Sequence, residues 1–363
     1  MAHRLAGLLE NLVEATATPY PVDRYLEFVS PMLTWRETRA KVVRHERRTD
    51  RTVTLTLAPT RQWKGHVAGQ YVEVSTVVDG VRHRRFFSPA NAEQDARTIE
   101  LTVTAHDDGF ISKHLRENVR AGDVLGLGTA AGAFTLPAQR PEHTVLVSGG
   151  SGITPVISML RTLVAEGHHK PVTLVHYARS ADDVPYLAEL EATARAIGNV
   201  DVRLHFTRTA DGERFDGGRF APEHLDGLAD ADGAQVFLCG PSSLMTQVRE
   251  HMDARGLGDR LHSEAFTVDT APVIDPNQPI TGTLTYTESD TASENDGRTI
   301  LEQAEATGLN PEYGCRMGIC FSCTKVRKSG CTRNILTGEL DSEADQPIQI
   351  CVSAPVGDVD IEL

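Results

Sequence analysis

The sequence predicts a multidomain protein in which an antiparallel β-barrel, a doubly wound α/β domain and a small α+β domain follow one another. Residues 36–138 contain short runs of alternating or β-branched residues, separated by Gly, Pro and Asp, which is typical of a small barrel. Residues 139–270 alternate between strand-like and helix-like patterns, which indicates a parallel sheet. Residues 280–363 follow the proline-rich stretch 271–279, which we expect to be a linker.

The N-terminal residues 1–35 are predicted to form a helical segment. Five apolar residues fall on one face at helical spacing: Leu5, Leu8, Leu9, Leu12 and Val13. This face can pack on its own protein, or it can dock to a membrane surface or a partner. Few basic residues flank it, so the pattern does not favour a lipid surface.

Composition and charge exclude several classes of protein. The 363 residues have a formal net charge of -14, which argues against nucleic acid as a partner. The sequence has no apolar stretch long enough to span a bilayer and no secretion signal, so we expect a cytoplasmic protein with reduced thiols. Residues 272–363 have 15 Asp or Glu against 6 Lys or Arg, a net of -9, so the acidity is concentrated there.

Four cysteines near the C-terminus have the spacing of an iron–sulfur site. Cys315, Cys320 and Cys323 are separated by four and then two residues, and Cys351 follows after a long gap. This is the plant-type [2Fe–2S] spacing, in which a tight loop supplies three thiolates and a distant strand supplies the fourth. A zinc site more often has paired C-x2-C units, and a disulfide framework does not suit a reducing compartment. Cys331 stands outside the pattern, and we expect a structural role for it.

The segments "LEQAEATGLNPEYGCRMGICFSCTKVRKSG" and "QICVSAPVGDVDIEL" carry a resemblance to the plant-type ferredoxin family. The resemblance implies a β-grasp ferredoxin domain over residues 280–363 that carries single electrons. Its metal ligands would be Cys315, Cys320, Cys323 and Cys351.

Three segments of the predicted barrel resemble motifs of the ferredoxin–NADP reductase superfamily: "RFFSPAN", "DDGFISKHL" and "GAFTLP". The resemblance implies FAD rather than FMN in residues 36–138, with Arg85 pairing with the pyrophosphate as a fork and Ser88 bonding near flavin N5. Phe87 stands where the family has a tyrosine that stacks on the flavin ring. The implied flavin-binding residues are Arg85, Phe86, Phe87, Ser88, Thr102, Gly109 and Ser112.

Three segments of the predicted α/β domain resemble the same superfamily: "VLVSGGSGITP", "FLCGPSSLM" and "HSEAF". The first lies at a strand-to-helix turn, where a glycine-rich loop can hold a pyrophosphate. The residues that the resemblance assigns to the nicotinamide end are Gly149, Gly150, Gly152, Thr154, Cys239, Gly240 and Pro241, with Phe266 covering the flavin. Ser88, Cys239 and Glu264 are the implied catalytic residues.

Arginines after two predicted strands favour NADPH, because arginine suits a ribose 2′-phosphate. They are Arg179, with Ser180 beside it, and Arg208. NADH stays an alternative, since an arginine at the first position also occurs in family members that use NADH.

The resemblance covers all but the N-terminal segment and implies an NAD(P)H-dependent reductase. Hydride would pass from the nicotinamide to FAD, and single electrons would pass through the [2Fe–2S] cluster to an oxygenase. The segment "PVDRYLEFVSPMLTWRETRAKV" and the C-terminal end resemble reductases that accompany fatty acyl desaturases, so a membrane di-iron desaturase or hydroxylase is the favoured acceptor. A Rieske ring hydroxylase, a cytochrome P450 and a role as redox sensor or diaphorase stay open. Association with a membrane surface through the partner is a further expectation.

Overall fold

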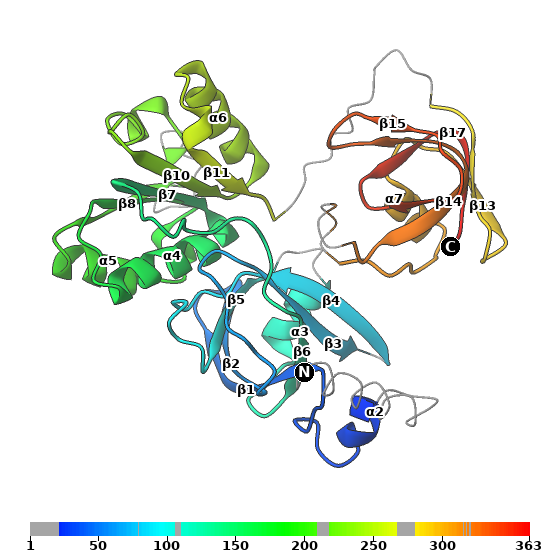
Figure 1. Ribbon diagram of the computed structural model, residues 1–363, viewed down its shortest axis with the longest axis horizontal. Helices are drawn as coiled ribbons and strands as arrows, with labels where there is room; N and C mark the ends of the chain where they lie inside the picture. Colours follow the sequence, from blue (N-terminus) through cyan, green and yellow to red (C-terminus); the bar gives the residue numbers. More distant parts are fainter. Residues whose placement is uncertain are drawn as a thin grey trace, which may run out of the picture. The chain divides into compact units, whose positions relative to one another are not determined.

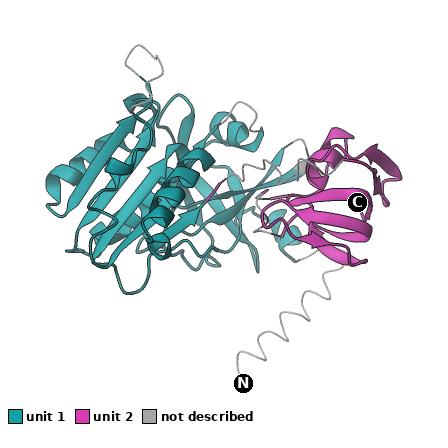
Figure 2. Ribbon diagram, turned by 90° about the horizontal axis from the view of Figure 1, so that it is seen from above, with its two compact units in different colours: residues 1–264 teal, residues 265–363 magenta. Residues whose placement is uncertain are grey.

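The computed structural model describes residues 22–78, 80–105, 110–208, 218–266, 280–314, 316, 318 and 321–363 (Figure 1). The chain divides into two compact units, residues 1–264 and residues 265–363 (Figure 2). The predicted N-terminal helix with Leu5–Val13 and the predicted linker 271–279 lie outside the described residues.

The first part of unit 1 is a curled antiparallel sheet of six strands, in the order β4-β3-β6-β1-β2-β5. A short helix, α2 (Val22–Glu27), precedes it, and α3 (Phe110–Glu117) lies between its last two strands in the chain. The two ends of the sheet meet where Pro89, just after β4, bridges to Leu101 of β5. The antiparallel flavin-type barrel that the alternating patterns predict is therefore confirmed. Its strands are β1 (Thr38–Arg47), β2 (Thr52–Pro59), β3 (Val72–Val78), β4 (Val81–Phe87), β5 (Ile99–Thr104) and β6 (Val124–Leu127).

The barrel closes around an apolar core because one face of each strand points inward. Val53, Leu55 and Leu57 of β2 are fully buried together with Ile99 and Leu101 of β5. These residues alternate with others along their strands, as expected for a sheet with one face on a core.

The second part of unit 1 is a parallel sheet of five strands, in the order β11-β10-β7-β8-β9. Strand β8 is buried along its whole length and β7 is buried after His143, which is why their sequences are mainly apolar runs rather than alternating ones. Helices α4 and α5 cover one face and α6 the other (Figure 1), so the doubly wound arrangement is confirmed. The elements are β7 (His143–Gly149), α4 (Ile153–Ala165), β8 (Val172–Ala178), α5 (Leu187–Ala196), β9 (Val200–Phe206), β10 (Ala234–Cys239), α6 (Ser242–Ala254) and β11 (Leu261–Glu264).

Unit 2 is a mixed sheet packed against one helix. Strand β12 pairs with β17 in parallel, and the other strand pairs are antiparallel. Helix α7 begins with a capping box in which Thr299 and Glu302 bind each other's backbone N–H. This arrangement agrees with the predicted α+β ferredoxin domain. Its elements are β12 (Thr283–Tyr286), β13 (Thr291–Glu294), α7 (Ile300–Ala306), β14 (Thr324–Asn334), β15 (Leu340–Asp341), β16 (Gln346–Gln349) and β17 (Ser353–Ile361).

Over the described residues, no helix combines the length and the apolar character that a membrane crossing requires.

Candidate functional site

The glycine-rich loop 149–152 and the segment 239–241 meet at the carboxyl edge of the parallel sheet. They lie at the ends of β7 and β10, which are parallel neighbours in the sheet. The strand that follows β7 in the chain lies on one side of this pair, and the strand that follows β10 lies on the other side. A Cβ added at Gly152 would lie 2.1 Å from the carbonyl oxygen of Cys239, so only glycine permits this approach. Open α/β sheets bind ligands at such a reversal of strand order.

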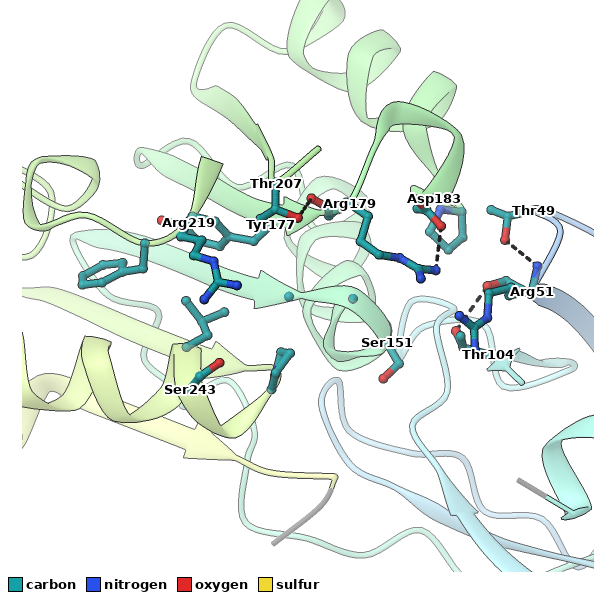
Figure 3. Close-up of a pocket in the computed structure, with 18 of the residues that line it drawn as sticks. Thr49, Arg51, Thr104, Ser151, Tyr177, Arg179, Asp183, Thr207, Arg219 and Ser243 are labelled. Atoms are coloured by element: carbon teal, nitrogen blue, oxygen red, sulfur yellow. Dashed lines mark hydrogen bonds and ion pairs between the residues drawn. The ribbon is translucent and has the colours of Figure 1, made fainter. Parts of the chain in front are cut away.

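A cleft of about 350 Å³ opens at this edge, between the parallel sheet and the barrel (Figure 3). Three arginines line it, Arg51 from the barrel and Arg179 and Arg219 from the α/β domain, with Asp183 as the only acidic residue among the described residues of the lining. Such a cleft, with glycine loops and cationic side chains, suits a nucleotide phosphate. The lining also includes Thr49, Thr52, Thr104, Ser151, Tyr177, Phe220, Ser243 and Gln247.

The structure brings some of the predicted nicotinamide-domain residues into the cleft lining and leaves others behind it. Those in the lining are Gly149, Gly150, Arg179 and Pro241. Thr154 is buried and its hydroxyl donates to the carbonyl oxygen of Ser151, 3.2 Å away, inside the loop itself. The predicted residues that do not line the cleft are Gly152, Thr154, Ser180, Arg208, Cys239, Gly240, Glu264 and Phe266.

One carboxylate organises the end of β8. Arg179 Nη2 lies 3.0 Å from Asp183 Oδ1, and Ser180 Oγ donates to Asp183 Oδ2 at 2.8 Å. The backbone N–H of Asp183 donates to the carbonyl of Ser180, which fixes the turn. Asp183 was not predicted, although its position four residues after Arg179 was a signal for this ion pair.

Arg219 and Phe220 reach the cleft because Gly218 lies directly against the end of β9. A Cβ on Gly218 would fall 1.5 Å from the carbonyl oxygen of Phe206. Phe220 meets the ring of Tyr177 edge-on at 6.5 Å, and Figure 3 shows Arg219 on the opposite side of the cleft from Asp183. These residues were missed because a contact between a loop and a distant strand leaves no local pattern.

Cys239 and Glu264 end neighbouring parallel strands and pair in register. Cys239 is fully buried, and burial raises the pKa of its thiol well above the usual value, with the Glu264 carboxylate raising it further. Burial also raises the pKa of Glu264 to about 7. One oxygen of that carboxylate, Oε2, is buried without a hydrogen-bond partner in the described part of the chain. The pair therefore consists of a neutral thiol and a carboxyl that can hold a proton near neutral pH.

The predicted flavin motif lies on the edge strand β4. Arg85 and Phe87 are opposite Val74 and Val72, two residues that face the barrel core, so all four share a face. Phe87 packs partly against that core. Phe86 lies on the other face, with its ring 5.4 Å from that of Tyr71 and perpendicular to it.

Ser88 provides an observation in favour of a bound flavin. Its hydroxyl is buried and has no hydrogen-bond partner among the residues that the structure describes. Buried polar groups are normally paired, so an orphaned hydroxyl three residues after Arg85 in the chain fits a ligand with hydrogen-bonding atoms. Ser112 lies in the first turn of α3, whose Phe110 ring contacts His83 of β4. Gly109, predicted for the same segment, lies outside the described residues.

Thr102 stands at the junction of the barrel and the α/β domain rather than in the cleft lining. Its buried hydroxyl bonds to Thr54 Oγ1 at 2.7 Å and to the hydroxyl of Tyr186. Arg161 joins the two domains nearby, since it binds Glu100 of β5 and Glu189 of α5. A cofactor role for Thr102 stays a prediction, as does that of Phe266, which follows β11 by two residues.

Two of the four predicted metal ligands lie next to each other in unit 2. Cys323 and Cys351 are buried in the same core, and the backbone N–H of Ile350 donates to the carbonyl of Cys323 at 3.2 Å. Cys315 and Cys320 lie outside the described residues. Arg316 and Phe321, between the predicted ligands, have φ values of 58° and 59°, which non-glycine residues rarely adopt. Strained backbone of this kind is typical of loops built around a ligand, so the described residues fit an iron–sulfur cluster.

Three protein-family models match the chain in order. They are the oxidoreductase FAD-binding domain over residues 40–136, the oxidoreductase NAD-binding domain over residues 146–250 and the 2Fe-2S iron-sulfur cluster binding domain over residues 286–356.

Relatives and a solved structure match over most of the length of the chain. The chain is 33% identical to an NADPH oxidoreductase of Mycobacterium tuberculosis, over 98% of this chain and 92% of the relative. It is 27% identical to the glycine betaine monooxygenase reductase subunit of Pseudomonas aeruginosa, over 81% of this chain and 86% of the relative. The structure of phthalate dioxygenase reductase matches with a TM-score of 0.63 and 24% identity, over 90% of this chain and 97% of that one, which shows a shared fold.

The predicted cofactor classes, FAD, a nicotinamide nucleotide and a [2Fe–2S] cluster, each have a matching domain. Together with the cleft at the sheet edge and the two buried cysteines Cys323 and Cys351, these matches lead to one conclusion. The chain belongs to the family of NAD(P)H-dependent oxidoreductases that join an FAD-binding, an NAD-binding and a 2Fe-2S domain in one polypeptide.

Proposed function

We propose that this chain is the reductase component of an oxygenase system, taking electrons from NADPH and delivering them singly to an O₂-activating enzyme. The observation that carries the proposal is that one chain contains a nucleotide cleft, a flavin-type barrel and an iron–sulfur-type domain with Cys323 and Cys351 buried in its core. When bound, FAD would accept a hydride and release electrons one at a time, and the [2Fe–2S] cluster would relay them.

The cleft residues would bind and orient the nucleotide. Gly149 and Gly150 bring backbone N–H groups close to a pyrophosphate, and the guanidinium groups of Arg179 and Arg219 favour the additional phosphate of NADPH. The relative from Mycobacterium tuberculosis is named as an NADPH enzyme, which supports this choice.

The buried pair at the ends of β10 and β11 would shape the reacting end of the nucleotide. The protonated thiol of Cys239 is a small apolar surface rather than a nucleophile, and so it would set how close the ring can come. Glu264 can hold a proton there near neutral pH. Ser88 would give its orphaned hydroxyl to the flavin.

The acceptor is the finer part of the proposal. The resemblance of this chain to reductases that accompany fatty acyl desaturases favours a membrane di-iron desaturase as the acceptor. A hydroxylating monooxygenase is the second candidate, because relatives are named as reductase components of a glycine betaine monooxygenase and of a 3-ketosteroid-9-alpha-monooxygenase.

Reconstitution tests both parts. Purified chain, NADPH and a membrane acyl-CoA desaturase are combined, flavin and cluster bleaching are followed without O₂, and the double bond is assayed after O₂ is admitted. We expect desaturation with the wild-type chain, and its loss in Cys323→Ser while NADPH still bleaches the flavin. Cys331→Ser is the matched control, because Cys331 lies on β14 outside the four-cysteine pattern and should keep full activity.

The outcomes separate the levels of the proposal. Bleaching of both cofactors without desaturation would retain the reductase and move the acceptor to a hydroxylating monooxygenase, tested in the same way. Failure of NADPH and NADH alike to bleach the flavin would overturn the reductase itself.

A further inference from the structure

The cleft contains one feature that opposes the binding of NADPH. Asp183 is the single carboxylate among the described residues of the lining, and it stands beside Arg179 at the end of β8. Figure 3 shows both side chains at the same end of the cleft, with Arg51 of the barrel nearby. A carboxylate in this position repels a ribose 2′-phosphate, whereas it can accept a hydrogen bond from a ribose 2′-hydroxyl.

The hydrogen bonds around Asp183 leave its oxygens able to accept more. Each carboxylate oxygen receives one bond, Oδ1 from Arg179 and Oδ2 from Ser180. A carboxylate offers about four acceptor sites, so it keeps capacity toward the cleft. Ser180 does not line the cleft and uses its only hydroxyl hydrogen on Asp183, which makes it a support for the carboxylate rather than a donor to a phosphate.

Arg179 presents a complementary group. Only Nη2 of its guanidinium is bound to Asp183, and the fork has five N–H donors in all. A ribose 2′-hydroxyl can therefore accept from Arg179 and donate to Asp183 at the same time. A 2′-phosphate can only accept, so it gains from Arg179 and is repelled by Asp183.

We propose that Asp183 is a selectivity residue for the nucleotide: it gives the cleft a binding mode for the 2′-hydroxyl of NADH and weakens the grip on the 2′-phosphate of NADPH. The inference rests on the proposed placement of the ribose beside Arg179. It predicts that the chain uses both nucleotides, with a preference for NADPH that is smaller than three cleft arginines alone would produce.

The test compares two inhibitors that differ only in the 2′-phosphate, adenosine 2′,5′-bisphosphate and 5′-AMP. Their inhibition constants are measured against NADPH on the flavin-loaded chain with ferricyanide as electron acceptor, and kcat and KM are measured for NADPH and NADH. In Asp183→Asn we expect the constant for adenosine 2′,5′-bisphosphate to fall by about tenfold and that for 5′-AMP to rise by about threefold. The KM values should change in the same directions, while kcat stays nearly constant because the hydride-transfer end is untouched.

Asp182→Asn is the matched control, because Asp182 is exposed, carries the same charge one residue away and does not line the cleft. It should leave the ratio of the two inhibition constants unchanged. If Asp183→Asn fails to fold, Asp183→Ser serves as the second variant, since a hydroxyl can still bond within the turn without the charge.

Two results would overturn the proposal. Weaker binding of adenosine 2′,5′-bisphosphate to Asp183→Asn would mean that the carboxylate positions Arg179 for the phosphate. An Arg179→Met variant with both constants unchanged would place the ribose elsewhere. That result would leave the proposed reductase function standing, because NADPH turnover by the wild-type chain in the same assay tests that function separately.

Discussion

Glu264 is a residue whose burial should make folding stability depend on pH. Burial raises its pKa to about 7, against an ordinary value of 4.5, so the folded protein keeps the proton to a higher pH than the unfolded chain does. The folded state then binds more protons between those two values, and the free energy of unfolding falls as pH rises through that window. Above pH 7 the loss is complete, at about 3 kcal/mol for a shift of this size.

Replacing Glu264 with Gln removes the titration. We expect Glu264→Gln to unfold at a higher temperature than the wild type at pH 8 and at nearly the same temperature at pH 5. Thermal midpoints of the flavin-loaded protein across this range measure the effect, with Glu191→Gln, an exposed glutamate of α5, as control. A difference between Glu264→Gln and wild type that is equal at both ends of the range would contradict the expectation.

Single residues of the site divide into those that the sequence could predict and those that it could not. Gly149, Gly150 and Pro241 could be named from the sequence because their short segments resemble motifs of a known superfamily, and in the structure they line the cleft. Arg219 owes its place to the contact of Gly218 with the carbonyl of Phe206, which no local pattern encodes. Ser180 was predicted as a ligand, but its hydroxyl is directed to Asp183 by a turn whose geometry the sequence leaves open.

At the scale of elements, β14 depends on a buried arginine. Arg327 has no exposed surface, and its guanidinium binds Thr332 Oγ1 at 2.6 Å and Asp341 Oδ1 at 2.9 Å. It also binds the backbone carbonyls of Asp341 and Glu343. One side chain thus ties β14 to β15 and to the turn that follows.

We expect Arg327→Met to destabilise unit 2 by about 3 kcal/mol or more, because the carbonyls and the carboxylate it binds would lose their donor. Denaturant unfolding followed by the visible absorbance of the cluster measures this. Lys328→Met is the control, since Lys328 is exposed and its ion pair with Asp345 lies at the surface. Equal midpoints for the two variants would show that the buried network contributes nothing specific.

The elements themselves were predictable where their pattern was strong. The alternating strands of the barrel and the apolar strands β7, β8 and β10 follow from periodicity, because one buried face or two buried faces leave different patterns. Strand β14 has the sequence TKVRKSGCTRN, which is polar and contains a glycine, so it does not read as a central strand. Its pairing with β17 and β16 overrides that local preference.

At the scale of the whole molecule, charge is distributed unevenly. The chain has a formal net charge of -14, and residues 272–363 contribute -9 of it. In unit 2, a groove is lined by Phe321, Glu339 and Asp341, and Phe321 is 67% exposed although it lies between two predicted cluster ligands. An exposed aromatic ring beside acidic side chains suits an acceptor with a basic rim and an apolar centre.

Electron delivery to a basic acceptor should therefore weaken as salt rises. Exposed charges are screened over about 10 Å at 0.1 M ionic strength and over about 3 Å at 1 M. With cytochrome c as a basic test acceptor, we expect the second-order rate of NADPH-dependent reduction to fall about tenfold between 0.05 and 0.5 M salt.

Two charge-reversal variants locate the effect. Glu339→Lys should lower the rate at low salt and flatten its dependence on salt. Glu191→Lys, with the same change of charge on α5 of unit 1, should leave the rate and its salt dependence unchanged. A flat salt dependence in the wild type would mean that the acidic groove of unit 2 does not guide the acceptor. An equal effect of the two variants would mean that only the net charge of the whole chain matters, so the comparison separates a local docking surface from a general field.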